Sequence, residues 1–117
     1  MNATRFFLPA AIAAAALSGG AAQAMDSAKL ADEKQCFQCH ALDRHVAGPS
    51  FQAIGAIYRR IKNPVPKMVA VIRDGSDAHM GPLWDNARMP DMSERPEVSQ
   101  REARQLARWI LKQRAPR

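Results

Sequence analysis

The stretch Cys36-Phe37-Gln38-Cys39-His40 decides how the rest of the chain is interpreted. On one helical turn, positions i, i+3 and i+4 lie on the same face, so the two thiols and the imidazole can reach one ligand together. The C-x-x-C-H spacing is the attachment signature of c-type haem. We therefore predict one covalently bound haem c, with Cys36 and Cys39 forming thioethers to its two vinyl groups and His40 binding the iron.

Three other chemistries use closely spaced cysteines. A thioredoxin-like redox pair needs a βαβ context, and the sequence has no alternating strand pattern. A structural zinc site needs four protein ligands, and Cys36, Cys39 and His40 are too crowded to bind one ion together. A disulfide between the cysteines would close almost no loop and add little stability, and it would leave His40 unexplained. Haem attachment accounts for the motif better than these three alternatives.

The first 24 residues have the features of a cleavable export signal. Arg5 supplies a positive charge, residues 6–17 are almost entirely apolar, and residues 22–24 read Ala-Gln-Ala, a small-x-small cleavage pattern. The apolar run is shorter than the roughly 20 residues that span a bilayer. We predict that residues 1–24 are a signal peptide and that 25–117 form one periplasmic domain. An uncleaved membrane anchor is the alternative.

The net charge and the distribution of basic residues limit which classes of partner this domain can bind. The 117-residue chain carries a formal net charge of +6, and a basic protein of this kind raises the question of nucleic acid. The predicted export argues against it, and the sequence has no basic cluster with interleaved aromatics. Arg101, Arg104, Arg108 and Lys112 recur at helical spacing and are expected to form a solvated face. The positive charge favours docking to acidic partner surfaces.

The hydrophobic periodicity predicts an all-α fold of about four helices. We expect the first over residues 27–39 and the second after a cap at Ser50. The third is expected to follow two prolines and to end at Gly75. Residues 76–98 show no hydrophobic periodicity and form a long connecting loop, and loops of this length in small domains usually have a function.

The last helix is predicted to begin at a capping box formed by Ser99 and Glu102. Apolar residues recur along each predicted helix and define its buried stripe. The stripe of the first helix is Leu30 and Phe37, and that of the second is Phe51, Ile54, Ile57, Tyr58 and Ile61. Pro64 and Pro66 separate the second helix from the third, whose stripe is Met68, Val69 and Ile72. The stripe of the last helix is Ala103, Leu106, Ala107, Ile110 and Leu111.

Residues 25–117 resemble the short bacterial class I cytochromes c, especially the cytochrome c-551/c-552 type. The matching features are the haem motif ending at His40, Gly48-Pro49 shortly after it and Met89-Pro90 in the late loop. The final helix matches through Glu102-Ala103, Leu106-Ala107 and Trp109-Ile110-Leu111. The resemblance implies a small cytochrome c fold around one covalent haem.

The resemblance also implies an axial ligand pair. His40 would be the proximal ligand, and the Pro49 carbonyl would accept a hydrogen bond from its other ring nitrogen and fix the tautomer. Met89 would supply the second axial ligand, and the adjacent Pro90 would stiffen its approach. Met80 and Met92 lie in the same loop and could replace Met89.

Several further residues are candidates for a minor role at the haem. His45 and His79 could replace the methionine as the sixth ligand, although loop histidines of this kind are more often solvated or bonded to a haem propionate. Trp84 and Arg88 are candidate partners of a propionate. The remaining large side chains near the motif and the helix crossing are expected to pack rather than react, and these are Phe37, Tyr58, Leu83 and Trp109.

The expected function is that of a one-electron carrier, not an enzyme, because two protein ligands on the iron leave no open position for a substrate. Its partners would be larger redox proteins, such as an oxidase, a reductase or a dehydrogenase, and we expect a monomer. Two alternatives stay open. One is a five-coordinate haem that binds or reduces a small ligand, and the other is a cytochrome subunit of a periplasmic dehydrogenase complex.

Overall fold

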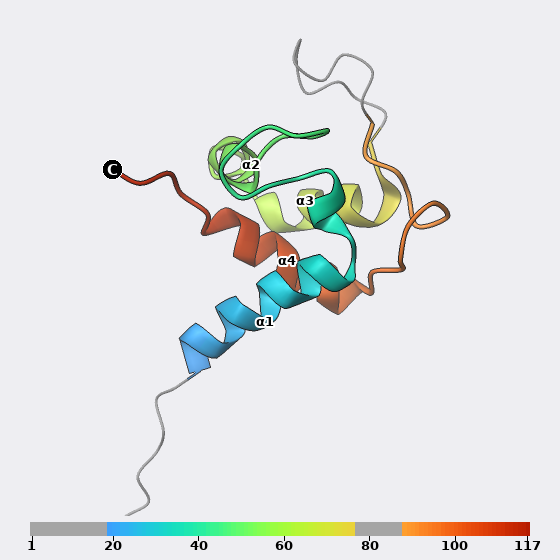
Figure 1. Ribbon diagram of the computed structural model, residues 1–117, viewed down its shortest axis with the longest axis horizontal. Coiled ribbons are helices and arrows are strands. Elements are labelled where there is room, and N and C mark those ends of the chain that lie inside the picture. The colour runs from blue at the N-terminus through green and yellow to red at the C-terminus, as the bar shows by residue number, and fades with distance from the viewer. Residues whose placement is uncertain (1–18, 77–87) are drawn as a thin grey trace, which may run out of the picture.

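A computed structural model describes residues 19–76 and 88–117, and within these ranges the fold is all-α (Figure 1). This confirms the predicted fold class. The only β feature in the described part of the chain is an isolated antiparallel bridge between Ser76 and Met89. The elements are α1 (Gly19–Glu33), the short 3-10 helix η1 (Cys36–Gln38), α2 (Phe51–Tyr58), α3 (Pro64–Asp74) and α4 (Gln100–Leu111).

Helix α4 is the centre of the fold, since it contacts α1, α2 and α3 (Figure 1). Its start is fixed by the predicted capping box: the Ser99 hydroxyl accepts the Glu102 N–H at 3.1 Å, and the Glu102 carboxylate accepts the Ser99 N–H at 2.8 Å. The buried residues of α4 recur at helical spacing, as predicted, and Trp109 joins them. They are Ala103, Leu106, Ala107, Trp109 and Ile110.

Helix α2 begins where predicted, because the Ser50 hydroxyl accepts the Ala53 N–H at 3.0 Å. Its predicted buried stripe is wrong at two positions. Ile57 is 42% exposed, and Ile61 follows the end of the helix. Position i+6 from Phe51 is rotated away from the face on which i, i+3, i+4 and i+7 lie, so Ile57 faces solvent.

Helix α3 begins earlier than the sequence indicated, because Pro64 and Pro66 lie inside its first turn rather than before it. Proline is tolerated there since the first N–H groups of a helix have no intrahelical acceptor. The predicted end is confirmed. Gly75 is the C-cap with φ 74° and ψ −173°, a backbone conformation that is open essentially to glycine alone.

The predicted single helix over residues 27–39 is wrong in both bounds. Helix α1 begins at Gly19 and ends at Glu33. Gln35 then adopts a left-handed conformation with φ 63°, which breaks the α-helical path before η1 begins at Cys36. The predicted cleavage position after residue 24 lies within α1 of the full chain, and removal of residues 1–24 stays a prediction.

Helices α2 and α4 approach each other closely at Gly55. A Cβ atom there would lie 2.6 Å from the Ile110 carbonyl oxygen, so a larger residue would force the helices apart. One turn later, Arg59 Nη1 donates to the carbonyls of Leu111 and Gln113 at 2.8 and 3.0 Å. Leu111 is the last residue of α4, where carbonyls lack intrahelical donors, and Gln113 lies two residues beyond it.

Candidate haem-binding site

An apolar cleft lies among η1, α2, α3, α4 and the segment that follows Arg88. Its empty space, including the open mouth, is about 1000 Å³. Much of its wall comes from the buried or half-buried side chains of Phe51, Ile54, Met68, Ile72, Leu106 and Ile110. The cleft can therefore hold a large apolar group, with a few polar side chains to orient it.

Cys36 and Cys39 both line this cleft, and each has a free thiol. The turn that carries them is tight: the N–H groups of Cys39 and His40 both donate to the Cys36 carbonyl, at 3.2 and 3.0 Å. Cys36 is half-buried and Cys39 is exposed. Burial raises the pKa of the Cys36 thiol, and the positive charge of Arg95 opposes that change.

The His40 imidazole also lines the cleft and is held in one orientation. Its Nδ1 lies 2.6 Å from the Pro49 carbonyl oxygen, and because a carbonyl can only accept, Nδ1 carries the proton. Burial lowers the pKa of His40, against the Pro49 hydrogen bond, which raises it. The ring stacks on Phe51 with centroids 5.2 Å apart. Nε2 is thus left with a lone pair available to a metal.

Gly48 makes room for that ring. A Cβ atom on Gly48 would lie 2.9 Å from His40 Cε1 and 3.2 Å from Nδ1. Its own N–H donates to the Cys39 carbonyl at 2.7 Å, which ties the loop back to the motif. The Gly48-Pro49 pair therefore does two things: glycine admits the imidazole, and proline supplies the carbonyl that orients it.

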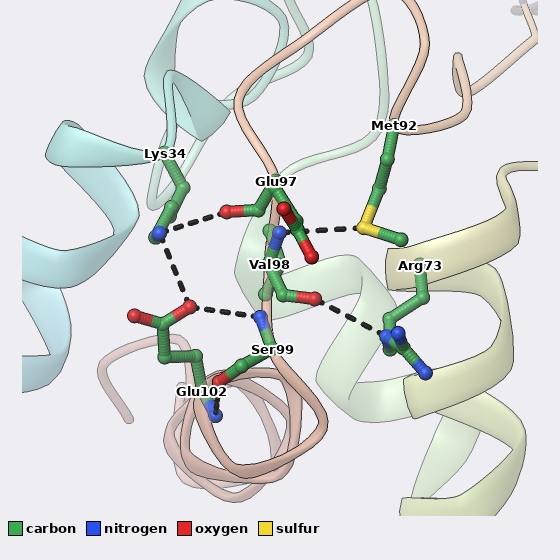
Figure 2. A network of polar contacts seen from close by, with 7 residues as sticks. All are labelled: Lys34, Arg73, Met92, Glu97, Val98, Ser99 and Glu102. Atoms are coloured by element: carbon green, nitrogen blue, oxygen red, sulfur yellow. Dashed lines mark hydrogen bonds and ion pairs between the residues drawn. The ribbon is translucent and has the colours of Figure 1, made fainter.

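Met89 is half-buried and lines the same cleft as His40. Its carbonyl accepts the Ser76 N–H at 3.0 Å, which fixes its backbone next to the end of α3. The sulfur of Met92 is used differently, because Met92 Sδ accepts the Val98 N–H at 3.3 Å (Figure 2). Met68 also lines the cleft, but it is a buried core residue of α3. Met80 lies outside the described residues.

The other candidate residues are dispersed. Arg88 is exposed and pairs with the Glu94 carboxylate at 2.8 Å. His45 is exposed in the loop before Gly48. His79, Leu83 and Trp84 fall outside the described residues. The predicted packing roles hold for the described aromatics: Phe37 contacts Phe51 and Trp109 edge-on, with centroids 5.6 and 6.4 Å apart, and half-buried Tyr58 lines the cleft.

Two basic residues near the site were not anticipated from the sequence. Arg95 is half-buried in the cleft wall, and its Nε donates to the Pro90 carbonyl at 2.8 Å. Lys34 also lines the cleft, donates to the Glu97 carbonyl at 2.7 Å and pairs with Glu102 at 3.1 Å (Figure 2). Lys34 bonds Glu97 and Arg95 also bonds the Ile72 carbonyl, and both partners are far away in the sequence. No local pattern could therefore have indicated these two residues.

The donor set fits an iron porphyrin. Two thiols and an imidazole come from one tight turn, a thioether comes from a distant segment, and the wall between them is apolar. Thiols at this spacing form the covalent attachment of c-type haem, and imidazole with thioether is a known axial pair for its iron. The fold and the site together define the class of small, all-α proteins that bind haem covalently.

Comparison with known proteins narrows the class further, although no family model matches the chain. Cytochrome c-551 of Pseudomonas aeruginosa is 30% identical over 103 residues, which cover 88% of this chain and 91% of that protein. Cytochrome c-552 of Nitrosomonas europaea is 33% identical over 99 residues, or 85% and 87% of the two chains. The chain belongs to the small class I c-type cytochromes of the c-551/c-552 type.

Solved structures agree with this assignment. The crystal structure of Nitrosomonas europaea cytochrome c552 matches with a TM-score of 0.64 and 30% identity, covering 74% of this chain and 99% of that one. The class 1 cytochrome MtoD from Sideroxydans lithotrophicus ES-1 matches with a TM-score of 0.59 and 25% identity, covering 78% and 97%. The cofactor is therefore covalently attached haem c, and the protein is an electron carrier.

Proposed function

We propose that the protein is a periplasmic, mono-haem, one-electron carrier in which His40 and Met89 bind the iron and Cys36 and Cys39 hold the porphyrin covalently. The observation that carries this proposal is that Met89 lines the same apolar cleft as an imidazole whose Nδ1 is already committed to Pro49. An imidazole and a thioether are thus both available at the cleft. With both axial positions filled, the bound haem supplies reversible one-electron chemistry and no substrate site.

The residues of the chain contribute orientation and exclusion of water. Pro49 holds the His40 ring through Nδ1, which leaves Nε2 outside that hydrogen bond, and the Phe51 ring stacks against the imidazole. The apolar wall from α2, α3 and α4 would exclude water from the porphyrin. Cys39 is exposed, so the edge of the haem attached there would lie nearest to a partner.

Larger redox proteins with acidic docking surfaces are the proposed partners, because the chain is strongly basic. Within the described ranges, no helix combines the length and apolar character needed to cross a bilayer. We propose that residues 1–24 direct export and are removed, and that the mature protein acts as a monomer.

The test is an intact mass and an absorption spectrum of the purified protein. We expect the mass of residues 25–117 plus one haem, and a weak band toward the red end of the ferric spectrum from sulfur bound to iron. Met89→Ala is expected to remove that band, whereas Met92→Ala is expected to keep it. Ready binding of carbon monoxide by the reduced wild-type protein at neutral pH would contradict the ligand pair and favour a five-coordinate haem.

A further inference from the structure

Arg95 connects the segment that carries Met89 to the end of helix α3. Its Nε donates to the Pro90 carbonyl at 2.8 Å, and its Nη2 donates to the Ile72 carbonyl. Pro90 follows Met89 directly in the chain, and Ile72 lies in the last turn of α3. One guanidinium therefore holds two backbone oxygens from segments that are about twenty residues apart.

The last turn of α3 needs such a donor. The final four carbonyls of a helix have no intrahelical partner, and a cation at that end also interacts favourably with the helix dipole. The Gly75 N–H satisfies the Val71 carbonyl at 2.9 Å, and Arg95 satisfies the next one, at Ile72. Arg95 thus caps α3 from a segment that follows it in the chain.

The same end of α3 lies directly against the Met89 segment. A Cβ atom on Gly75 would lie 2.4 Å from the Met89 carbonyl oxygen and 2.9 Å from the carbonyl carbon of Pro90. Ser76 then donates its N–H to the Met89 carbonyl at 3.0 Å. The Met89-Pro90 backbone is therefore fixed at two adjacent carbonyls, by the Ser76 N–H and by the Arg95 guanidinium.

We propose that Arg95 is a positioning residue for the axial methionine: by joining the Pro90 and Ile72 carbonyls, it holds the Met89 segment against α3 so that the thioether stays directed into the cleft. This inference rests on the proposed ligand role of Met89. Arg95 itself contributes no ligand atom. Arginine suits the task because its planar fork presents several donors in fixed directions, which the single ammonium of lysine does not.

The rest of the loop is anchored independently of Arg95. Arg73 Nε donates to the Val98 carbonyl at 3.1 Å, and Lys34 holds the Glu97 carbonyl (Figure 2). These contacts lie at the α4 end of the loop, away from Met89 in the sequence. Arg73 therefore offers a matched control: it is an arginine of similar burial that bonds a carbonyl of the same loop, but not the carbonyl next to the ligand.

The experiment compares Arg95→Gln with Arg73→Gln and with Arg108→Gln, which removes the same charge from an exposed position on α4. Imidazole is titrated into the ferric holoproteins, because it binds iron only when the axial methionine leaves. We expect Arg95→Gln to bind imidazole about tenfold more tightly, as expected for about 1.4 kcal/mol lost from two charge-assisted hydrogen bonds. The two control variants are expected to stay within about twofold of wild type, since neither contacts the Met89 segment.

A second measurement does not depend on which residue binds the iron. Amide hydrogen exchange of Ser76 in the reduced protein reports how often the Ser76–Met89 bond opens. We expect that exchange to be about tenfold faster in Arg95→Gln, by the same free-energy difference. Arg95→Lys, which keeps the charge but not the fork, is expected to fall between wild type and Arg95→Gln in both measurements. It replaces Arg95→Gln should that variant yield no holoprotein.

Unchanged imidazole affinity together with unchanged Ser76 exchange in Arg95→Gln, or in Arg95→Lys where that variant replaces it, would overturn the proposal. An equal effect from Arg73→Gln would also overturn it, because a general loosening of the loop would then explain the changes in imidazole affinity and Ser76 exchange. A wild-type protein without the sulfur–iron band would instead contradict the ligand role of Met89. In that case Ser76 exchange alone decides whether Arg95 holds the segment.

Discussion

At the residue scale, the site depends on small side chains that let the larger ones reach their positions. Gly48 lies beneath the His40 ring, and Gly75 lies beneath the Met89 carbonyl. Each glycine is next in the chain to a residue whose backbone makes a hydrogen bond at the site: Pro49 to His40 and Ser76 to Met89. The two predicted ligands thus lie on different segments of the cleft wall, and each segment contains a glycine where a larger residue would clash.

Gly48→Ala is predicted to displace the His40 ring. The new Cβ would lie 2.9 Å from Cε1, so the imidazole or the loop must shift, which costs about 1–3 kcal/mol in a packed site. Thermal unfolding of the holoprotein, compared with that of Ala47→Ser at the exposed neighbouring position, measures the loss. Equal stability of Gly48→Ala and wild type would show that the ring has free space.

Gly75→Ala is predicted to disturb the Met89 segment. The residue has φ 74°, and the added Cβ would lie 2.4 Å from the Met89 carbonyl oxygen. Backbone strain and the close contact together are expected to cost more than 1 kcal/mol, measured by denaturant unfolding. Gly75→Asn is expected to be no more stable than Gly75→Ala, since this combination of φ and ψ is open essentially to glycine alone. An unfolding free energy of Gly75→Ala equal to that of wild type would show that neither the strain nor the contact matters.

At the element scale, the helix ends are set by side chains that could be identified in the sequence and by others that could not. The caps at Ser50, Ser99 and Gly75 follow local rules, and all three were predicted correctly. The arginines that bond carbonyls at the C-terminal ends of helices were not predicted, because Arg59 reaches α4 and Arg95 reaches α3 only after the chain has folded.

The break after α1 shows the limit of periodicity as evidence. The apolar spacing continues through the haem motif, yet Gln35 turns into the left-handed region and the cysteines lie on a 3-10 turn. Glutamine carries no turn signal, so nothing local distinguishes this break from continued helix. The motif itself still predicted that Cys36, Cys39 and His40 line one cleft, and the three-residue spacing of the cysteines keeps them on one face of a tighter turn. The ligand roles of these side chains stay predictions.

The capping box of α4 gives a pH-dependent prediction. The hydrogen bond from the Ser99 N–H, followed by the contact with Lys34, lowers the pKa of Glu102. A carboxylate with a lowered pKa stabilises the folded state above its unfolded pKa, about 4.3, and loses that contribution as the pH falls through its folded value. Glu102→Gln is thus expected to cost about 1 kcal/mol at pH 7 and progressively less below about pH 4.

Thermal unfolding of wild type and Glu102→Gln across that pH range is the measurement. Glu97→Gln provides a control, since it removes an exposed carboxylate that lies outside the capping box. A difference between wild type and Glu102→Gln that does not change with pH would show that the charge of Glu102 is unimportant to the cap.

At the scale of the whole molecule, part of the described core forms the wall of the cleft. Buried residues of α2, α3 and α4 line it together with the haem motif. A small domain buries only a modest apolar core, so a large apolar cofactor at this position supplies contacts that the chain alone does not. Because haem binds the folded chain, it stabilises that state.

The double variant Cys36→Ala, Cys39→Ala is accordingly predicted to be loosely folded, with a broad, weakly cooperative thermal transition seen by circular dichroism. The wild-type holoprotein is the reference, and Cys39→Ala alone tests whether one thioether suffices. A sharp transition at the wild-type temperature in the double variant would show that the polypeptide does not need its cofactor to complete the core.

The Pro49 carbonyl that accepts the hydrogen bond from His40 Nδ1 has one more consequence. Some histidine ligands are oriented by a carboxylate, which can itself gain or lose a proton and so alter the basicity of the ring. A peptide oxygen does not titrate in the physiological range. The basicity of the His40 ring is therefore independent, at this contact, of acidification of the surroundings, which would suit the proposed role of His40 as an iron ligand in a periplasmic carrier.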